Sequence, residues 1–420
     1  MPLGAVWVLL FIWRKPISYV GFGGLYLIEI FFLTSVLIFL SSSMLRGKIP
    51  NLYFGSMTQF FILSLGLFIV SGLFSAALSP SVSLKGLIPL VYTAYFVPLY
   101  YVFVRGERKH LLSSIKLQVA CYLLLPFLIY VVRNYLLAGF TIALPNVGGG
   151  GFTFTYGLAL SCCLFLTTNK MPRLFLTMAC LAAATLLFQR GVFLCFALSA
   201  GFLYFSDYNN KKVLSVTLYI LVFLALFFFF IAVLGAVVRL YFPDLESRYP
   251  IAIDAVARFL LSIFSSDISI GGNALGTRNH RIDMWMEIIN SSLNDPFVLF
   301  FGNGFYGEVG DSIGVSFRAP HNGFITIFFR MGLFGVLCYL AFGIAVMRIL
   351  GKFASLGSRS KDAAFVGKFG VLNLGAFLGD ALTGTIVDSP YTYFLFISSV
   401  AASLAFLSNE RRRLGQGEGA

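Results

Sequence analysis

The sequence predicts an all-α, polytopic membrane protein, and three observations lead to this fold class. Of the 420 residues, 59% are hydrophobic and only 11% are charged, and the mean hydropathy is +0.89. A soluble domain of this length cannot bury so much apolar surface. Apolar runs close to the roughly 20 residues that a spanning helix needs recur along the chain. We therefore expect a bundle of eleven or twelve transmembrane helices with one long, partly helical outer loop.

Eleven apolar runs are candidate membrane spans. They cover residues 22–43, 58–78, 87–104, 115–136, 152–166, 174–188, 192–205, 213–238, 323–350, 364–381 and 391–407. A shorter run at 3–13 leaves open whether the bundle has eleven spans or twelve. Several runs are shorter than a bilayer is thick, which local thinning of the membrane accommodates.

The distribution of basic residues predicts the orientation. A net charge of +13 would suggest nucleic-acid binding in a soluble protein, but cytoplasmic loops of membrane proteins carry an excess of lysine and arginine. Basic loops alternate with loops almost free of lysine, and Arg411-Arg412-Arg413 marks the cytoplasmic side. The segment 241–320 has no lysine and holds nine of the 17 acidic residues, so we place it outside. Arg14-Lys15 does not fit this scheme. We expect membrane lipids as partners and no nucleic acid.

Three regions follow from this pattern. Residues 1–240 form the N-terminal transmembrane helices, residues 241–320 form the outer loop with amphipathic helices, and residues 321–420 form the C-terminal transmembrane helices and a cytoplasmic tail. The apolar segment 251–264 is expected to lie as a helix against the membrane. The segment 281–293 is expected to be an amphipathic helix, with one apolar face made of Trp285, Ile288, Ile289 and Leu293.

Short polar motifs follow the amphipathic helix. Asp295-Pro296 is expected to end it, and Gly302-Asn303-Gly304 is expected to form a turn. The six cysteines all lie in apolar runs without CxxC spacing, so we expect no disulfide and no metal site. The sequence has no HExxH motif, DxD pair or Walker loop, so it predicts no metal ion and no cofactor.

Two groups of arginines are candidate phosphate ligands. Arg190 lies between two apolar runs on the outer side, where a guanidinium is costly unless it meets an anion. The alternative is an arginine that extends to the membrane interface. Arg281, with Arg278 beside it, offers a fork of donors that matches phosphate oxygens. The alternative there is a solvated face of a surface helix.

His321 is the candidate base. It follows Pro320 at the outer entrance of a span, where an imidazole can take a proton from a sugar hydroxyl near neutral pH. Asn322 either caps the helix or orients the imidazole, and the alternative for the pair is a helix cap without chemistry.

Arg133, Arg318 and Arg330 are weaker candidates. Arg330 is about 13 Å into its helix and is expected to face a cavity rather than lipid, with Asp380 or Asp388 as its partner. Arg318, in the loop before His321, is a secondary candidate for holding a polar ligand.

An ordered set of these motifs resembles the O-antigen ligase and polymerase superfamily. The motifs are Arg281-x-x-x-Trp285, Asp295-Pro296, Gly302-x-Gly304, Pro320-His321-Asn322 and Gly332-x-x-Gly335. Gln189-Arg190-Gly191 resembles the Ser-Arg-Gly of that family, except that Gln189 stands where a small residue is usual. The resemblance is best over residues 278–340; the rest of the chain is similar in topology.

The resemblance implies a GT-C-like membrane glycosyltransferase of the bacterial inner membrane that works at the periplasmic face. Its donor would be a glycan on undecaprenyl pyrophosphate, and it would need neither a nucleotide sugar nor a metal. A polymerase passes the chain to the next lipid-linked repeat unit, with a chain-length regulator protein as a partner, whereas a ligase passes it to lipid A–core. The contexts of His321 and Arg330 resemble polymerases more.

The residue roles follow from combining this resemblance with the chemistry of the side chains. Arg190 and Arg281 are expected to bind the pyrophosphate, whose negative charge grows as it leaves. His321 is expected to take the proton of the acceptor hydroxyl. The residues expected to help hold acidic or polar ligands are Arg278, Arg318 and Asn322. A different class of function, a flippase or another transporter, predicts charged residues spread along a path through the bilayer.

Overall fold

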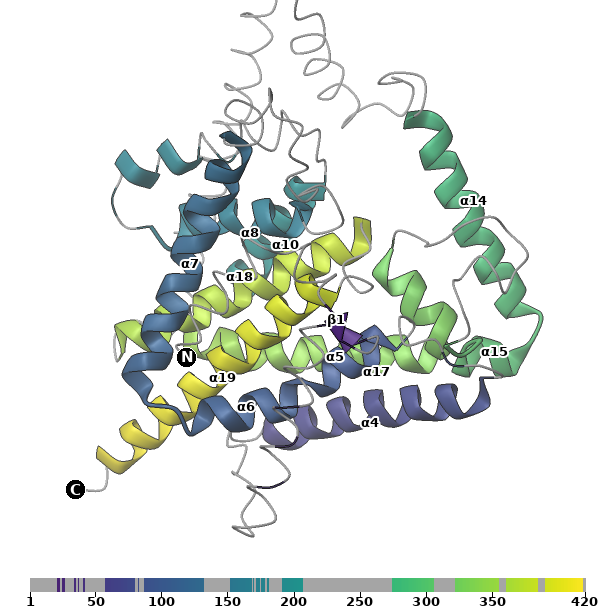
Figure 1. The fold of residues 1–420 in the computed structure, drawn as a ribbon, viewed down its shortest axis with the longest axis horizontal. Coiled ribbons are helices and arrows are strands. Elements are labelled where there is room, and N and C mark those ends of the chain that lie inside the picture. The colour runs from purple at the N-terminus through teal and green to yellow at the C-terminus, as the bar shows by residue number, and fades with distance from the viewer. Residues whose placement is uncertain are drawn as a thin grey trace, which may run out of the picture.

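The computed structural model describes residues 57–79, 87–131, 152–167, 191–206, 274–305, 322–354, 360–383 and 390–417, with short pieces elsewhere before residue 181. Apart from a two-stranded antiparallel pair, β1 (Gly21–Phe22) and β2 (Leu25–Tyr26), the regular structure of these residues is helical (Figure 1). Four of the described helices are long and apolar enough to cross a membrane: α4, α17, α18 and α19. The prediction of a helical, polytopic membrane protein is confirmed.

The structure describes eleven helices. They are α4 (Met57–Leu78), α5 (Ile88–Ala94), α6 (Phe96–Val104), α7 (Arg108–Val131), α8 (Phe152–Phe165), α10 (Gly191–Ser206), α14 (Ala274–Leu293), α15 (Pro296–Phe301), α17 (Gly323–Ala354), α18 (Lys361–Thr383) and α19 (Pro390–Gly417). Helices α4, α8, α10, α17 and α18 match predicted spans within four residues at each end, whereas α7 begins seven residues before its predicted span and α19 ends ten residues after its own. The run 87–104 is divided at Tyr95, and the first predicted span does not begin as a helix because β1 and β2 occupy its start. The predicted helices 213–238 and 251–264 lie outside the described residues, as do most residues of the predicted spans 22–43 and 174–188.

Helices α8, α10 and α18 lie side by side because glycines occupy their contacts (Figure 1). A Cβ atom added to Gly379 would lie 2.5 Å from the Cα of Cys195, and one added to Gly375 would lie 2.4 Å from the Cα of Ser199. On the other side of α10, a Cβ on Gly157 would lie 2.3 Å from that of Cys195. Such small residues let membrane helices approach backbone to backbone. Helices α10 and α18 are therefore packed backbone to backbone, which fixes their relative position.

Helix α19 forms the core of the bundle, and its central part is buried on every side. A helix in such a position must pair its polar side chains within the protein. Gln118 of α7 donates a hydrogen bond to the hydroxyl of Ser399. The hydroxyl of Tyr393 lies 2.6 Å from that of Thr93 and 3.0 Å from that of Tyr339. These contacts tie α19 to the helices around it.

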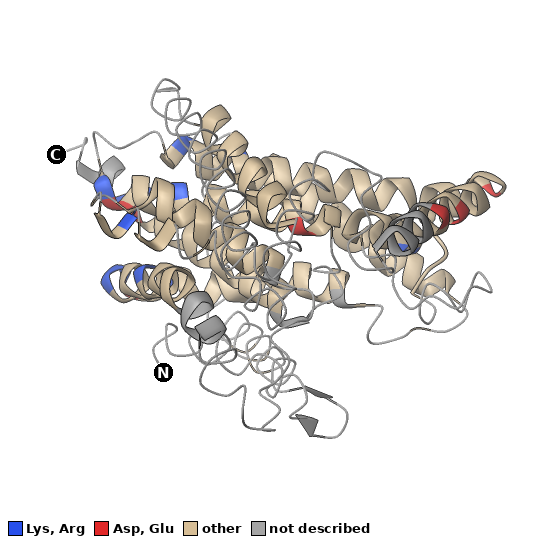
Figure 2. Cartoon of the chain, turned by 90° about the horizontal axis from the view of Figure 1, so that it is seen from above, with Lys and Arg blue, Asp and Glu red and all other residues tan. Residues whose placement is uncertain are grey.

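Charged side chains gather at opposite ends of the bundle (Figure 2). At the end near the C-terminus, which we call the basic end, Arg108 binds Glu410 at 2.5 Å and Asp362 at 3.2 Å. Glu410 is fully buried and also accepts hydrogen bonds from Ser360 and Arg413. Acidic residues of α14 lie at the other end (Figure 2). The described residues therefore separate charge as the predicted orientation requires.

Candidate functional site

Helix α14 packs its apolar face on the outer half of α17, which we define as residues 323–331. Met284 and Ile288 are buried against Phe329, and the partly buried neighbours of this cluster are Trp285, Ile325 and Phe328. The predicted amphipathic helix is thus confirmed, with two corrections. It begins at Ala274 instead of residue 281, and Leu293 is 58% exposed instead of lying on the buried face.

The predicted phosphate ligand Arg281 lies in α14, one turn before this cluster. Position 281 is three residues before Met284 and seven before Ile288, and such spacings share one face of a helix. It therefore belongs to the face that α14 turns toward the outer half of α17. Position 278 lies one turn earlier in the same helix. The side chains of Arg278 and Arg281 are outside the described residues.

Asn322 caps the outer half of α17. Its Oδ1 accepts hydrogen bonds from the backbone N–H groups of Phe324 at 3.0 Å and Ile325 at 3.1 Å, as an N-cap side chain does. Its Nδ2 donates to the carbonyl of Leu382 at 3.1 Å. The side chain is 7% exposed. Of the two predicted alternatives, the structure shows the cap, and it adds a tether to the end of α18. His321, immediately before Asn322, lies outside the described residues, as does Arg318.

The position next to Arg190 reaches the same end of α18. Arg190 itself lies outside the described residues, but Gly191 begins α10. A Cβ atom on Gly191 would lie 2.4 Å from Cγ2 of Thr153 in α8 and 2.7 Å from the hydroxyl oxygen of Thr383 in α18. Thr383 directly follows Leu382, the residue whose carbonyl Asn322 binds. The start of α10 at Gly191 and the start of α17 at Asn322 therefore lie at the same end of α18.

Three distant parts of the sequence thus meet at one place, which we call the outer site. It comprises the start of α10 at Gly191, the end of α18 at Leu382 and Thr383, and the start of α17 at Asn322, with α14 packed on the next turns of α17. Each predicted principal residue, at positions 190, 281 and 321, is in or directly beside one of these segments. The roles of the residues stay predictions, since their side chains are not described.

Glycines from two predicted motifs meet beside the outer site. Helix α17 is broken at Gly332, whose φ is 66°, and the turn after α15 has positive φ at Gly302 (79°) and Gly304 (81°). A Cβ on Gly332 would lie 2.3 Å from the carbonyl carbon of Phe300, and one on Gly302 would lie 2.4 Å from that of Arg330. Only glycine allows both this backbone conformation and this approach. The predicted turn is confirmed, and it packs against the break in α17.

Asp295 and Pro296, expected only to end a helix, also begin one. The Oδ1 of Asp295 accepts hydrogen bonds from the N–H groups of Phe297 at 2.9 Å and Val298 at 3.4 Å, and Pro296 occupies the first turn of α15. An aspartate cap followed by proline is a common start of a helix. The sequence interpretation missed the short helix α15. This helix leads into the Gly302–Gly304 turn, which packs against the break in α17.

The break also determines which part of α17 contains Arg330. Residues 333–354 form a continuous helix of about 33 Å at 1.5 Å per residue, which alone is long enough to cross a bilayer core of roughly 30 Å. Arg330 comes before this stretch and is 7% exposed. It is thus buried in protein on the Asn322 side of the break, before the part of α17 that is long enough to cross a membrane. Asp380, the acid proposed as its partner, is also buried, one turn before Thr383 in α18; Asp388 lies outside the described residues.

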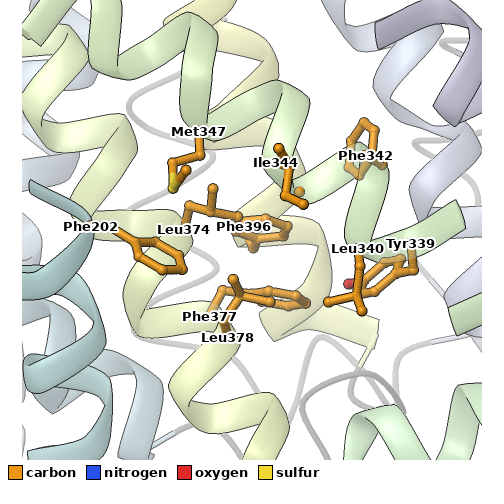
Figure 3. A pocket seen from close by; sticks show the side chains of 11 residues that line it. Phe202, Tyr339, Leu340, Phe342, Ile344, Met347, Leu374, Phe377, Leu378 and Phe396 are labelled. Carbon is orange, nitrogen blue, oxygen red and sulfur yellow. The ribbon is translucent and has the colours of Figure 1, made fainter. Parts of the chain in front are cut away.

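An apolar hollow of about 110 Å³ lies between α10, α17, α18 and α19 (Figure 3). The aromatic rings of Phe202, Phe377 and Phe396 form its wall. Leu340 and Ile344 of α17 line it as well and are 39% and 43% exposed, so the hollow reaches the side of the bundle that faces lipid. Among the described residues, His, Cys, Asp and Glu form no group of three or more that suits a metal.

Sequence interpretation did not single out α4, although its end lies beside the break in α17. The hydroxyl of Ser75 donates a hydrogen bond to the carbonyl of Arg330, and the side chain is buried. Ser71, Ser75 and Ser79 follow each other at intervals of four residues in an otherwise apolar run. This periodic polar stripe on a membrane helix is a signal that could have marked the contact.

The central part of the chain matches a known family. Residues 174–340 match the family described as O-antigen ligase. This range contains α10, α14, α15 and the outer half of α17, and it extends a few residues past Gly335. It leaves out α4, α18 and α19. No curated protein matches the chain.

Proposed function

Because residues 174–340 match the family described as O-antigen ligase, we propose that the protein is an O-antigen polymerase, or a polymerase of a related surface polysaccharide. It would transfer a glycan from undecaprenyl pyrophosphate to a lipid-linked repeat unit at the periplasmic face of the bacterial inner membrane. Both donor and acceptor are then lipid-linked oligosaccharides, and a chain-length regulator is a candidate protein partner.

The proposed chemistry uses three side chains. The oxygen of an acceptor sugar hydroxyl attacks the anomeric carbon of the donor, and the bond from that carbon to the pyrophosphate oxygen breaks. His321 takes the proton of the hydroxyl, and Arg190 and Arg281 stabilise the charge that grows on the leaving pyrophosphate. Arg278 and Arg318 hold polar groups of the glycans. Asn322 contributes by fixing the backbone beside His321, since both ends of its amide are used in the cap and the tether.

One observation carries this proposal: the convergence of the predicted segments at the outer site. Gly191 and Asn322 are 131 positions apart in the sequence, yet both contact the last two residues of α18. Helix α14, with position 281, packs on the half-helix that Asn322 begins. A transferase needs its phosphate ligands and its base around one reacting centre. A shared location of these segments is what that function requires.

The apolar hollow supports a lipid-linked substrate instead of a transported one. Leu340 and Ile344 bring its rim to the side of the bundle, where a lipid chain can enter from the bilayer. A transporter would instead line a path through the bundle with polar groups. The charged residues that the structure describes lie mainly at the two ends of the bundle, with few between them (Figure 2).

Substitution of the proposed principal residues tests the roles. Purified His321→Ala and Arg281→Ala are expected to retain binding of the lipid-linked substrate and to lose glycan extension. The expected loss of rate is about 10²–10⁴ for the base and about 10²–10³ for one donor to the leaving group. Matched controls at the basic end are His110→Ala and Arg105→Ala, whose side chains contact Glu107 and the ring of Tyr101. Normal turnover of both test variants would refute the assignment.

A ligase is the second candidate, because the matched family is described by that activity. A glycan ladder from cells that lack the protein separates the two. Loss of long chains, with one repeat unit still attached to lipid A–core, indicates a polymerase. Loss of every repeat unit from lipid A–core indicates a ligase. A ladder like that of the parent strain would count against both.

A further inference from the structure

The break in α17 frees backbone carbonyls that other segments must satisfy. At Gly332 the chain leaves the helical conformation, with φ 66° and ψ −168°. The carbonyl of Phe329 accepts a hydrogen bond from the N–H of Asn303 at 2.7 Å, and that of Arg330 accepts one from the N–H of Gly304 at 3.1 Å. In a membrane protein such freed groups are costly unless they are paired. Both of these donors are backbone groups of the turn after α15.

A further donor to this break is a side chain of α4. The hydroxyl of Ser75 donates a second hydrogen bond to the carbonyl of Arg330. Ser75 is 4% exposed and lies 255 positions away from Arg330 in the sequence. Its hydroxyl therefore connects a helix outside the matched family range to the inner end of the half-helix that begins at the outer site.

Other contacts show that the end of α4 holds the break and the turn together. A Cβ on Gly304 would lie 2.8 Å from Cβ of Ser79 and 3.1 Å from the carbonyl oxygen of Ser75. The rings of Phe74 and Phe301 meet edge to face, with centroids 5.1 Å apart. The last turn of α4 thus contacts α15, the turn and the break at once.

We propose that Ser75 is a positioning residue for the transfer reaction. By holding the carbonyl of Arg330, it sets the direction of the outer half of α17, which meets the rest of the helix at the break at Gly332. The first residues of that half-helix follow His321, and α14 packs along its side. This inference rests on the proposed function, and it adds a residue that neither the motifs nor the matched range contain.

A merely local role for the Ser75 hydroxyl predicts a different result from a positioning role. Ser64, on the same helix, is 3% exposed and donates only to the carbonyl of Phe61 in its own helix. Ser64→Ala therefore removes a buried hydroxyl of α4 whose hydrogen bond stays within α4, and it is the matched control. Ser75→Thr keeps a hydroxyl at the critical position and tests for rescue.

The experiment measures kcat and KM for glycan transfer in detergent, together with amide hydrogen exchange over residues 323–331. Ser75→Ala is expected to lower kcat about tenfold with little change in KM, because the base is misplaced while substrate still binds. Exchange over the half-helix is expected to rise in this variant. Ser75→Thr is expected to recover at least half of kcat, and Ser64→Ala is expected to match the unmodified protein in both measurements.

Two results would overturn the inference: unchanged kcat and exchange in Ser75→Ala, or an equal loss of kcat in Ser64→Ala. The failure of the proposed function looks different, since the unmodified protein would then transfer no glycan at all. In that event the exchange measurement still decides whether Ser75 holds the half-helix. Unchanged exchange in Ser75→Ala would refute the contact's role independently of the reaction.

Discussion

Asn322 joins two helices through three hydrogen bonds of one small side chain. Its Oδ1 serves the first turn of α17, and its Nδ2 reaches the carbonyl of Leu382 at the end of α18. Helix ends leave backbone groups without partners, and a buried end needs such a cap more than an exposed one. Asn322 thus holds the start of α17 to the end of α18, while its contact with a ligand stays a prediction.

Replacing Asn322 by alanine is expected to lower the free energy of unfolding by about 1–2 kcal/mol, because both cap bonds and the tether are lost. Asn322→Ser keeps a cap acceptor and should recover part of the loss. Thermal unfolding in detergent measures the effect. Asn290→Ala, at an exposed position of α14, is the control that should leave the midpoint unchanged. Equal midpoints for Asn322→Ala and the unmodified protein would contradict the cap's importance.

The broken helix α17 is the element that shapes the outer site. Its outer half carries the cap and the contact with α14, and its inner part, residues 333–354, crosses the bundle. The break persists because two glycine backbones, at Gly332 and Gly302, lie against each other's segments more closely than any side chain allows. Nonlocal packing, not a proline, therefore sets the kink.

The kink predicts that alanine substitutions at two glycines of α17 have different effects on the free energy of unfolding. Gly332→Ala is expected to reduce the free energy of unfolding by about 2–3 kcal/mol, since alanine is strained at φ 66° and its Cβ would meet Phe300. Gly343→Ala, with no atom within 4 Å of the added Cβ, is expected to be neutral or slightly stabilising. Unfolding midpoints and yields of monodisperse protein report both. The prediction is wrong if the two variants behave alike.

Elements decided by local pattern could be predicted from the sequence, and those decided by distant contacts could not. The apolar run 58–78 became α4 at Met57–Leu78, because length and hydropathy alone fix a span. The Gly302–Gly304 turn was likewise expected from its glycines. The break at Gly332 was not, because its cause is the backbone of Phe300, 32 positions earlier. Ser75 was overlooked for the same reason, since its partner is 255 positions away.

At the scale of the whole molecule, the bundle is polarised along its length. Basic residues and the buried carboxylate of Glu410 lie at one end, and the outer site with the acidic face of α14 lies toward the other (Figure 2). Excess lysine and arginine mark the cytoplasmic side of a membrane protein. The polarity is the one that the proposed orientation, with the outer site toward the periplasm, requires.

This orientation predicts which ends of the bundle a membrane-impermeant thiol reagent can reach. Asp283→Cys on the exposed face of α14 is expected to react in cells with a permeabilised outer membrane. Lys361→Cys, exposed at the start of α18, is expected to react only after the inner membrane is opened. The six native cysteines are buried and give little background. Reaction in the reverse order would invert the proposed topology.

The ion pairs of Glu410 bear on how the protein is handled in the laboratory. The carboxylate of Glu410 contacts Arg108, Ser360 and Arg413. The part of α19 beyond residue 407 therefore connects this helix to α7 and to the start of α18. A truncation or reporter fusion made before Glu410 would remove these contacts between α7, α18 and α19 and deprive the guanidinium of Arg108 of one of its two carboxylate partners. Tags belong after residue 417, where the last helix has ended.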